Sequence, residues 1–289
     1  MEWRERTYVM GILNLTPDSF SGDGLFAPSP LTPLPEGEGL GVRGVARRFL
    51  AAGADILDVG GESTRPGSQP LDAREELQRV IPTIRAIAAE FPHALISIDT
   101  YKAVVAEAAF TAGAHILNDV WGLRADPHLA AVASRANAQV VLMHNRSTPA
   151  NIEVRERLGN AYTGAEYQDL IADVKRELMD SVQIARSAGI PDERIILDPG
   201  IGFGKTVEQN LELINRLGEI RSLGFPVLLG PSRKSFIGYT LDLPPGQRLE
   251  GTAAAVAVGI TRGANIVRVH DVEFMLRVAR MTDAILQRK

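Results

Sequence analysis

Residues 94–144 read ALISIDTYKAVVAEAAFTAGAHILNDVWGLRADPHLAAVASRANAQVVLMH and hold three short apolar runs, at 94–99, 115–120 and 139–144. Each run is rich in Val, Ile or Leu and is bounded by glycine or polar residues, as buried strands are. The two stretches between them have the apolar spacing of helices. This segment therefore predicts a strand, helix, strand, helix, strand arrangement.

The same alternation extends over the whole chain. Eight apolar runs have strand character, at 8–13, 55–60, 94–99, 115–120, 139–144, 194–199, 226–231 and 265–270. Helices are expected at about 44–53, 72–91, 102–112, 127–136, 164–188, 207–223, 247–263 and 272–287. Continuously apolar strands are typical of a parallel sheet buried on both faces, and an eightfold alternation closes such a sheet into a (β/α)8 barrel. We expect one α/β domain over residues 1–289.

Composition narrows the classes of function. The net charge of −4, without a basic cluster, argues against nucleic acid as a partner. The chain has no cysteine, which excludes disulfides, thiolate nucleophiles and cysteine-bound metals. No apolar run approaches a membrane span, and the start lacks the apolar core of a signal peptide, so a cytoplasmic location is expected. A Pro/Gly-rich stretch at about 27–44 is interpreted as a surface insertion before the first helix.

Polar residues stand at the carboxyl ends of the eight runs, where barrels build their active sites: Asn14, Asp58, Asp99, Asn118, His144, Asp198, Ser232 and His270. Asp99, Asn118 and Asp198 can match a flat heterocycle that bears ring N–H and amino donors. The alternative is that they, or their neighbours Thr100 and Asp119, cap the turns that follow. Three such residues at separate strand ends favour a shared site.

Cations gather near the last two runs. Lys234 follows the seventh run, and Arg268 and His270 flank the end of the eighth. Barrels often hold phosphate at these loops, helped by a helix amino terminus such as the one expected after Asp271. The alternatives are a core histidine at His270, bonded to a backbone carbonyl, and a solvated surface charge at Arg233. For Arg233 the surface charge is the favoured interpretation.

Two loops, at 14–24 and 60–67, are long and polar and are expected to act as lids over the barrel mouth. Two tempting motifs fail. Gly204-Lys205-Thr206 resembles the end of a phosphate-binding P-loop, but the required first glycine is Pro199. The glycines at 200, 202 and 204 lack the dinucleotide spacing. His144 and His270 alone do not make a zinc site, and the first run lacks the His-x-His pair of barrel metallohydrolases.

Four motifs resemble dihydropteroate synthase, the folate-pathway target of sulfonamides: MGILNLTPDSFS at 10–21, DVGGESTRPG at 58–67, DPGIGFGK at 198–205 and SRKSFIG at 232–238. The likeness runs from about residue 8 to 286. It implies a transferase that condenses 6-hydroxymethyl-7,8-dihydropterin diphosphate with 4-aminobenzoate, giving 7,8-dihydropteroate and pyrophosphate. It also implies bound Mg²⁺ and a homodimer.

The resemblance assigns roles residue by residue. The pterin would be bound by Asp99, Asn118, Met143, Asp198, Phe203 and Lys234. The diphosphate would be bound by Thr64, Arg268 and His270, with Asn14 on the magnesium ion. The aminobenzoate pocket would be formed by Pro66, Phe203, Ser232 and Lys234, and the catalytic residues would be Asp18, Asp23, Arg65 and Lys234.

Two other interpretations stay open at this level. A methyltetrahydrofolate:corrinoid methyltransferase shares the barrel and a pterin pocket, but it would need a cobalamin-protein partner and no diphosphate site. The loop at 60–67 and the Ser232-Arg233-Lys234 motif count against it. A pterin-binding paralogue without synthase activity is the third interpretation, and the intact motif residues count against that one.

Overall fold

The predicted (β/α)8 barrel is confirmed by a computed structural model, which describes residues 6–15, 41–63, 67–148, 152–155 and 157–287. An eight-stranded parallel sheet has the order β8-β5-β4-β3-β2-β1-β10-β9. A parallel bridge between Leu197 and Val227 joins its two edges, so the sheet closes on itself. The barrel strands are β1 Tyr8–Asn14, β2 Ile56–Gly60, β3 Leu95–Asp99, β4 Ile116–Asp119, β5 Gln139–Met143, β8 Ile195–Asp198, β9 Leu228–Leu229 and β10 Ile266–Val269.

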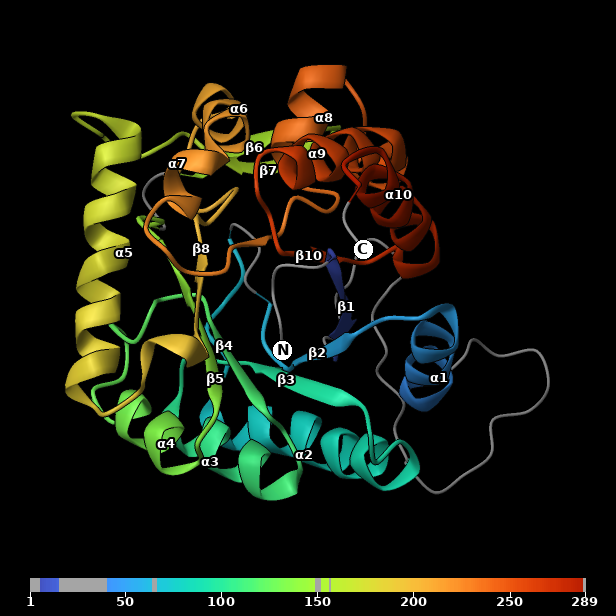
Figure 1. The fold of residues 1–289 in the computed structure, drawn as a ribbon, viewed down its shortest axis with the longest axis vertical. Helices are drawn as coiled ribbons and strands as arrows, with labels where there is room; N and C mark the ends of the chain where they lie inside the picture. The colour runs from blue at the N-terminus through green and yellow to red at the C-terminus, as the bar shows by residue number, and fades with distance from the viewer. Residues whose placement is uncertain (1–5, 16–40, 64–66, 149–151, 156, 288–289) are drawn as a thin grey trace.

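Helices surround the strands on all sides of the view in Figure 1. They are α1 Val42–Ala52, α2 Ala73–Glu90, α3 Ala103–Ala112, α4 Leu129–Arg135, α5 Leu170–Ser187, α6 Val207–Asn215, α7 Leu217–Arg221, α8 Ser235–Leu241, α9 Leu249–Thr261 and α10 Val272–Ile285, with 3₁₀ turns at Asp192–Arg194 and Pro245–Gln247. In this described part of the chain no helix is long and apolar enough to cross a membrane.

Three features differ from the sequence-based expectation. An antiparallel hairpin, β6 Ile152–Arg155 and β7 Gly159–Tyr162, occupies the connection between β5 and α5. Helix α5 accordingly begins at Leu170, where the Asp169 side chain accepts a hydrogen bond from Ala172 N. The expected helix at 207–223 is two helices that meet at Arg216, and the short helix α8 was not expected. Residues 27–40 of the predicted insertion lie outside the described residues.

Two apolar layers pack on the two faces of the sheet. One fills the inside of the barrel and consists of Met10, Ile56, Ile116, Val141, Ile196, Leu228 and Ile266. The other lies between the strands and the helices. Burying one such side chain contributes roughly 1.5–3 kcal/mol. Because successive side chains of a strand point to opposite faces, residues two or four positions after an inside residue also point into the barrel.

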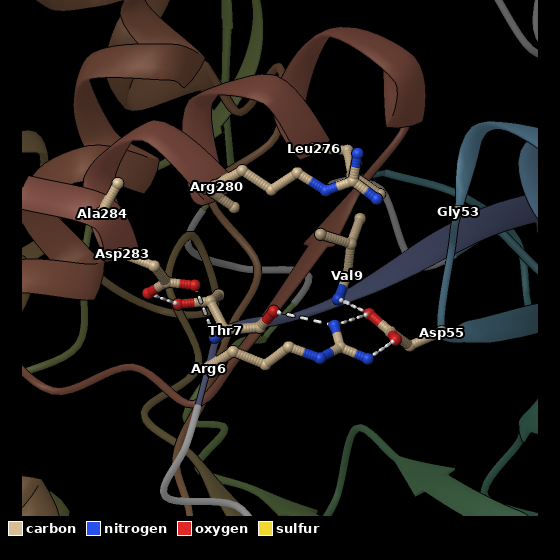
Figure 2. A pocket seen from close by; sticks show the side chains of 10 residues that line it. Arg6, Thr7, Val9, Gly53, Asp55, Leu276, Arg280, Asp283 and Ala284 are labelled. Atoms are coloured by element: carbon tan, nitrogen blue, oxygen red, sulfur yellow. Dashed lines mark hydrogen bonds and ion pairs between the residues drawn. The ribbon is translucent and has the colours of Figure 1, made fainter. Parts of the chain in front are cut away.

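The amino-terminal face carries a cavity of about 330 Å³ between the start of β1, the end of α1 and α10 (Figure 2). Here the buried carboxylate of Asp283 accepts hydrogen bonds from Thr7 N at 2.7 Å and Thr7 Oγ1 at 2.8 Å. Asp55 accepts from Val9 N at 2.8 Å and pairs with Arg6. These contacts join the start of β1 to α10 and to Asp55, which directly precedes β2. In barrels this face serves stability, and ligand sites lie at the opposite end.

Candidate active site

A row of residues crosses four neighbouring strands at the carboxyl-terminal mouth of the barrel. Asn14 pairs in register with Gly60, Gly60 with Asp99, and Asp99 with Asn118. Gly60 has no side chain, and a Cβ built there would lie 3.9 Å from Asn14 Oδ1 and 3.8 Å from Asp99 Oδ2. A Cβ there would make ordinary van der Waals contacts, and it would lie between two side-chain oxygens.

Arg268 reaches across the inside of the barrel to two carboxylates. Its Nε lies 2.6 Å from Asp58 Oδ2, and a terminal nitrogen lies 2.6 Å from Asp99 Oδ2. Asn118 Nδ2 donates to the same Asp58 oxygen at 3.1 Å. Asp58 is fully buried, and its Oδ1 has no partner among the described atoms. Burial raises the pKa of Asp99; Arg268 opposes this rise and Asp58 adds to it. Sequence analysis gave Asp58 no role.

Asp198 and Lys234 face the same space from β8 and from the loop after β9. Asp198 is 6% exposed, and its Oδ1 accepts from Gly200 N at 2.7 Å, so the carboxylate does cap the following turn. Lys234 Nζ donates to Ile201 O and lies 4.7 Å from the centroid of the Phe203 ring. Burial raises the pKa of Asp198, with Lys234 opposing, and burial lowers the pKa of Lys234 to about 8, with Asp198 opposing. Buried Met143 pairs in register with Asp198.

Hydrogen bonds hold the loop after β9: Thr252 Oγ1 of α9 accepts from Arg233 N at 3.1 Å, and Ser232 Oγ accepts from His270 N, directly after β10, at 3.2 Å. Ser232 Oγ lies 2.9 Å from His270 Nδ1, so this hydroxyl contacts the ring. Helix α10 begins at Val272, directly after Asp271 as predicted. The favoured interpretation of Arg233 as a solvated charge is wrong. Its side chain is 26% exposed and pairs with Asp271 at 2.6 and 2.9 Å, and its backbone has a positive φ of 55°.

Two of the polar residues at strand ends do not belong to the inside of the barrel. Asp119 and His144 directly follow Asn118 and Met143, whose side chains point into the barrel. Because successive side chains point to opposite faces, Asp119 and His144 point toward the helices. Asp119 accepts from Trp121 N at 2.8 Å and Leu123 N at 2.5 Å, which makes it the turn cap that the alternative interpretation predicted. Buried His144 has Nδ1 3.0 Å from Lys205 Nζ and Nε2 3.0 Å from Glu177 Oε2 of α5.

We expect His144 to make the fold sensitive to acid. Burial first, and then Lys205, lower the pKa of His144 to about 4; Arg124 acts in the same sense, and Glu177 opposes. An unfolded histidine titrates near 6.5, so between about pH 6.5 and 4 the unfolded chain binds more protons and stability falls as pH falls. At about 1.4 kcal/mol per pKa unit, a few kcal/mol are lost across this window.

Urea unfolding of the wild type and of His144→Asn, measured from pH 4 to pH 7, tests this expectation. Carboxylates titrate in the same window, so the comparison between the two proteins carries the result. The variant should be less stable at pH 7 and should show the shallower dependence on pH. Identical slopes would show that His144 does not titrate in this window.

Five predicted site residues lie outside the described residues: Asp18, Asp23, Thr64, Arg65 and Pro66. The structure brings together the others, namely Asn14, Asp99, Asn118, Met143, Asp198, Phe203, Ser232, Lys234, Arg268 and His270. The sequence placed Asp58 at a strand end without a specific role, and it assigned no role to Lys205. Asp58 could have been found by parity, because it stands two residues after the inside residue Ile56.

A (β/α)8 barrel with carboxylates, an amide and buried cations at its carboxyl-terminal mouth is a barrel enzyme built for a small polar substrate. A family model described as "Pterin binding enzyme" matches residues 10–270. The dihydropteroate synthase of Clostridium beijerinckii is 48% identical over 285 residues, which are 98% of this chain and 96% of that protein.

Solved structures agree with the family match. A dihydropteroate synthase from Clostridium difficile, solved in the presence of pteroic acid, is 45% identical with a TM-score of 0.84, and 100% of each chain is covered. The Yersinia pestis enzyme, solved with a sulfonamide drug complex, is 36% identical with a TM-score of 0.87, covering 99% of this chain and 96% of that one. The chain belongs to the pterin-binding enzymes and, within them, to the dihydropteroate synthases, which are transferases of folate biosynthesis.

Proposed function

We propose that the protein condenses 6-hydroxymethyl-7,8-dihydropterin diphosphate with 4-aminobenzoate to give 7,8-dihydropteroate and pyrophosphate. The observation that carries this proposal is the meeting of Asp198, Lys234 and the Phe203 ring inside the barrel mouth. A 2-amino-4-oxo heterocycle needs an acceptor for its amino group and N3–H, a donor for its carbonyl oxygen, and a ring or apolar surface against its face.

The proposed contacts with the pterin use hydrogen-bonding atoms of the barrel mouth that are still available. Asp198 Oδ1 is used by Gly200 N, which leaves Oδ2 for the two ring donors. Lys234 is proposed to donate to the ring carbonyl and N5, and Phe203 and Met143 are proposed to lie near the ring. Asn118 and Asp99 complete the polar lining from β4 and β3.

The diphosphate end is proposed around Arg268 and His270, beside the first turn of α10. Mg²⁺ is proposed beside Asn14, whose Oδ1 faces the position of Gly60, because Mg²⁺ takes few protein ligands when a diphosphate supplies the others. Among the described residues no group of three or more acidic or histidine ligands gathers, so the substrate would have to complete the coordination. When bound, Mg²⁺ would neutralise the charge of the leaving pyrophosphate.

The reaction breaks the C–O bond between the exocyclic methylene and the diphosphate and forms a C–N bond from the amine of 4-aminobenzoate, which loses a proton. We infer that the C–O bond breaks first and leaves a cation conjugated with the pterin ring, so that fixed charges rather than a nucleophilic side chain lower the barrier. Asp18, Asp23 and Arg65 are proposed near this charge. Pro66, Phe203, Ser232 and Lys234 are proposed to shape the aminobenzoate pocket, and Thr64 to meet the diphosphate.

A homodimer and a cytoplasmic location are part of the proposal. An exposed apolar stripe on α10 supports self-association, because Phe274, Met281 and Ile285 fall on one face of this helix and Val258 is exposed on α9. A stripe of this kind is suited to burial against a second copy of the same helix around a two-fold axis.

Release of pyrophosphate, measured with and without 4-aminobenzoate and with and without Mg²⁺, tests the proposed reaction. We expect stoichiometric pyrophosphate and 7,8-dihydropteroate when both substrates and Mg²⁺ are present, and strong loss of turnover with a chelator. Product formation that requires a cobalamin protein would favour the methyltransferase. Pterin binding without any product would identify a non-catalytic paralogue and contradict the proposal.

A further inference from the structure

The loop at 199–205, which follows β8 and carries Phe203, lies unusually close to the backbone that follows β5. Gly200 and Gly204 have positive φ angles of 72° and 65°. A Cβ on Gly200 would lie 1.8 Å from His144 O, and one on Gly204 would lie 2.5 Å from Arg146 C. Only glycine allows this approach. Glycine also leaves the loop backbone free to move unless other contacts hold it.

The side chain of Lys205 supplies those contacts. Lys205 is 2% exposed, and its ammonium turns back under the loop that precedes it. Nζ lies 2.9 Å from Gly200 O, 3.0 Å from Phe203 O and 3.0 Å from His144 Nδ1. An ammonium has three donors, and each of them has a partner here. Lys205 therefore clamps both ends of the segment between Asp198 and Phe203.

The surroundings of His144 favour the tautomer that accepts the hydrogen bond from Lys205 Nζ. An imidazole accepts at Nδ1 only when its proton is on Nε2, and Glu177 places a carboxylate oxygen 3.0 Å from Nε2. This contact is electrostatic rather than a regular hydrogen bond, because Nε2 has no partner that meets hydrogen-bond geometry among the described atoms. Glu177 also pairs with Arg146, which keeps its carboxylate charged. Glu177, His144 and Lys205 thus form one chain from α5 to the loop.

Burying an ammonium costs free energy, because the charge loses its hydration. Burial lowers the pKa of Lys205 to about 7, with Asp198 opposing. An apolar side chain of the same length would avoid this desolvation. Lys205 cannot contact the substrate, because its three donors are occupied and it lies under the loop. The proposed reaction also gives it no proton to carry.

We infer that Lys205 is a positioning residue, which holds the 199–204 backbone so that Asp198 and the Phe203 ring meet the pterin in one fixed arrangement. Without the ammonium, Gly200 O and Phe203 O lose their donor, and the loop relaxes away from this arrangement. Part of the binding free energy of the pterin is then used to order the loop. Pterin affinity should fall about ten- to hundredfold, which is the size of one lost charged hydrogen bond.

The test compares Lys205→Met with the wild type and with Lys175→Met, a matched change at a half-buried lysine of α5. Calorimetry with 6-hydroxymethylpterin gives Kd, steady-state assays give KM and kcat, and thermal melts give Tm. We expect Lys205→Met to weaken pterin Kd and to raise the pterin KM more than it lowers kcat, with Tm close to that of the wild type. Lys175→Met should leave all four values unchanged.

A merely structural lysine would lower Tm and leave the pterin Kd of the folded protein unchanged, and that result would overturn the inference. If Lys205→Met does not fold, Glu177→Gln decides. This variant removes no charge from the pterin cavity. It acts through His144 and Arg146, which both lie against the loop, and it should weaken pterin binding about three- to tenfold. An unchanged Kd there would equally overturn the inference. Because the inference rests on the proposed reaction, wild-type turnover is measured in parallel: a wild type that makes no product contradicts the reaction alone.

Discussion

Arg268→Ala is expected to destabilise the barrel by about 3–5 kcal/mol and to weaken diphosphate binding about ten- to hundredfold. The sequence predicts Arg268 as an anion contact. The structure shows that it also neutralises two carboxylates, at 2.6 Å from Asp58 and 2.6 Å from Asp99. Removing one partner of a buried ion pair leaves the other charges uncompensated, and here two carboxylates would face each other inside the barrel.

Urea unfolding and calorimetry with Mg²⁺-pyrophosphate separate the two effects. Adding Asp58→Asn to Arg268→Ala should recover much of the lost stability, because one of the stranded charges is gone, but it should restore no pyrophosphate binding. Surface Arg262→Ala serves as the control for loss of a positive charge, and it should change neither value. Wild-type stability in Arg268→Ala would mean that the contacts with Asp58 and Asp99 contribute nothing to the free energy of unfolding. Wild-type pyrophosphate affinity in a folded variant would remove Arg268 from the anion site.

The barrel and much of its mouth could be predicted because both follow from local patterns. Each apolar run became a strand within one or two residues of its expected bounds, because the runs are short, rich in Val and Ile, and bounded by glycine, proline or polar residues. The alternation of side chains along a strand then decides which polar residues at the strand ends point into the barrel. Asn118 stands two residues after Ile116 and points inside, whereas neighbouring Asp119 points outward and caps a turn.

The rest depends on contacts between distant parts of the chain. Arg268 meets Asp58 across 210 residues, and no local pattern signals that a predicted anion ligand is already paired. Lys205 ends the DPGIGFGK motif and resembles the lysine of a P-loop, but neither pattern indicates its contact with His144, 61 residues away. Short α8 has weak helical signals, and its position depends on burial of Phe236 and Ile237. Tertiary packing decides such elements more than propensity does.

Asp198→Asn is expected to weaken pterin binding by a hundredfold or more, which corresponds to a loss of about 3 kcal/mol or more. The structure shows why the two oxygens of this carboxylate are not equivalent. Oδ1 accepts from Gly200 N and caps the turn. An asparagine can keep that bond through its own oxygen, and its amide nitrogen then replaces Oδ2. A donor would face the amino group and N3–H of the pterin, so two charge-assisted bonds become a buried mismatch.

Asp119→Asn is the matched control, because Asp119 is also a buried aspartate at a strand end that caps a turn, but it points away from the barrel interior. Both oxygens of Asp119 accept from backbone N–H groups, so the amide keeps only one of these two bonds and the Tm should fall. Pterin affinity of the folded variant should be unchanged. In Asp198→Asn the Tm should hold or rise, because burial raises the pKa of Asp198 and removing the charge relieves desolvation. Pterin titration beside a thermal melt decides: if Asp198→Asn binds pterin as well as Asp119→Asn does, then Asp198 is only a cap, and the pterin must be held by the other residues of the mouth.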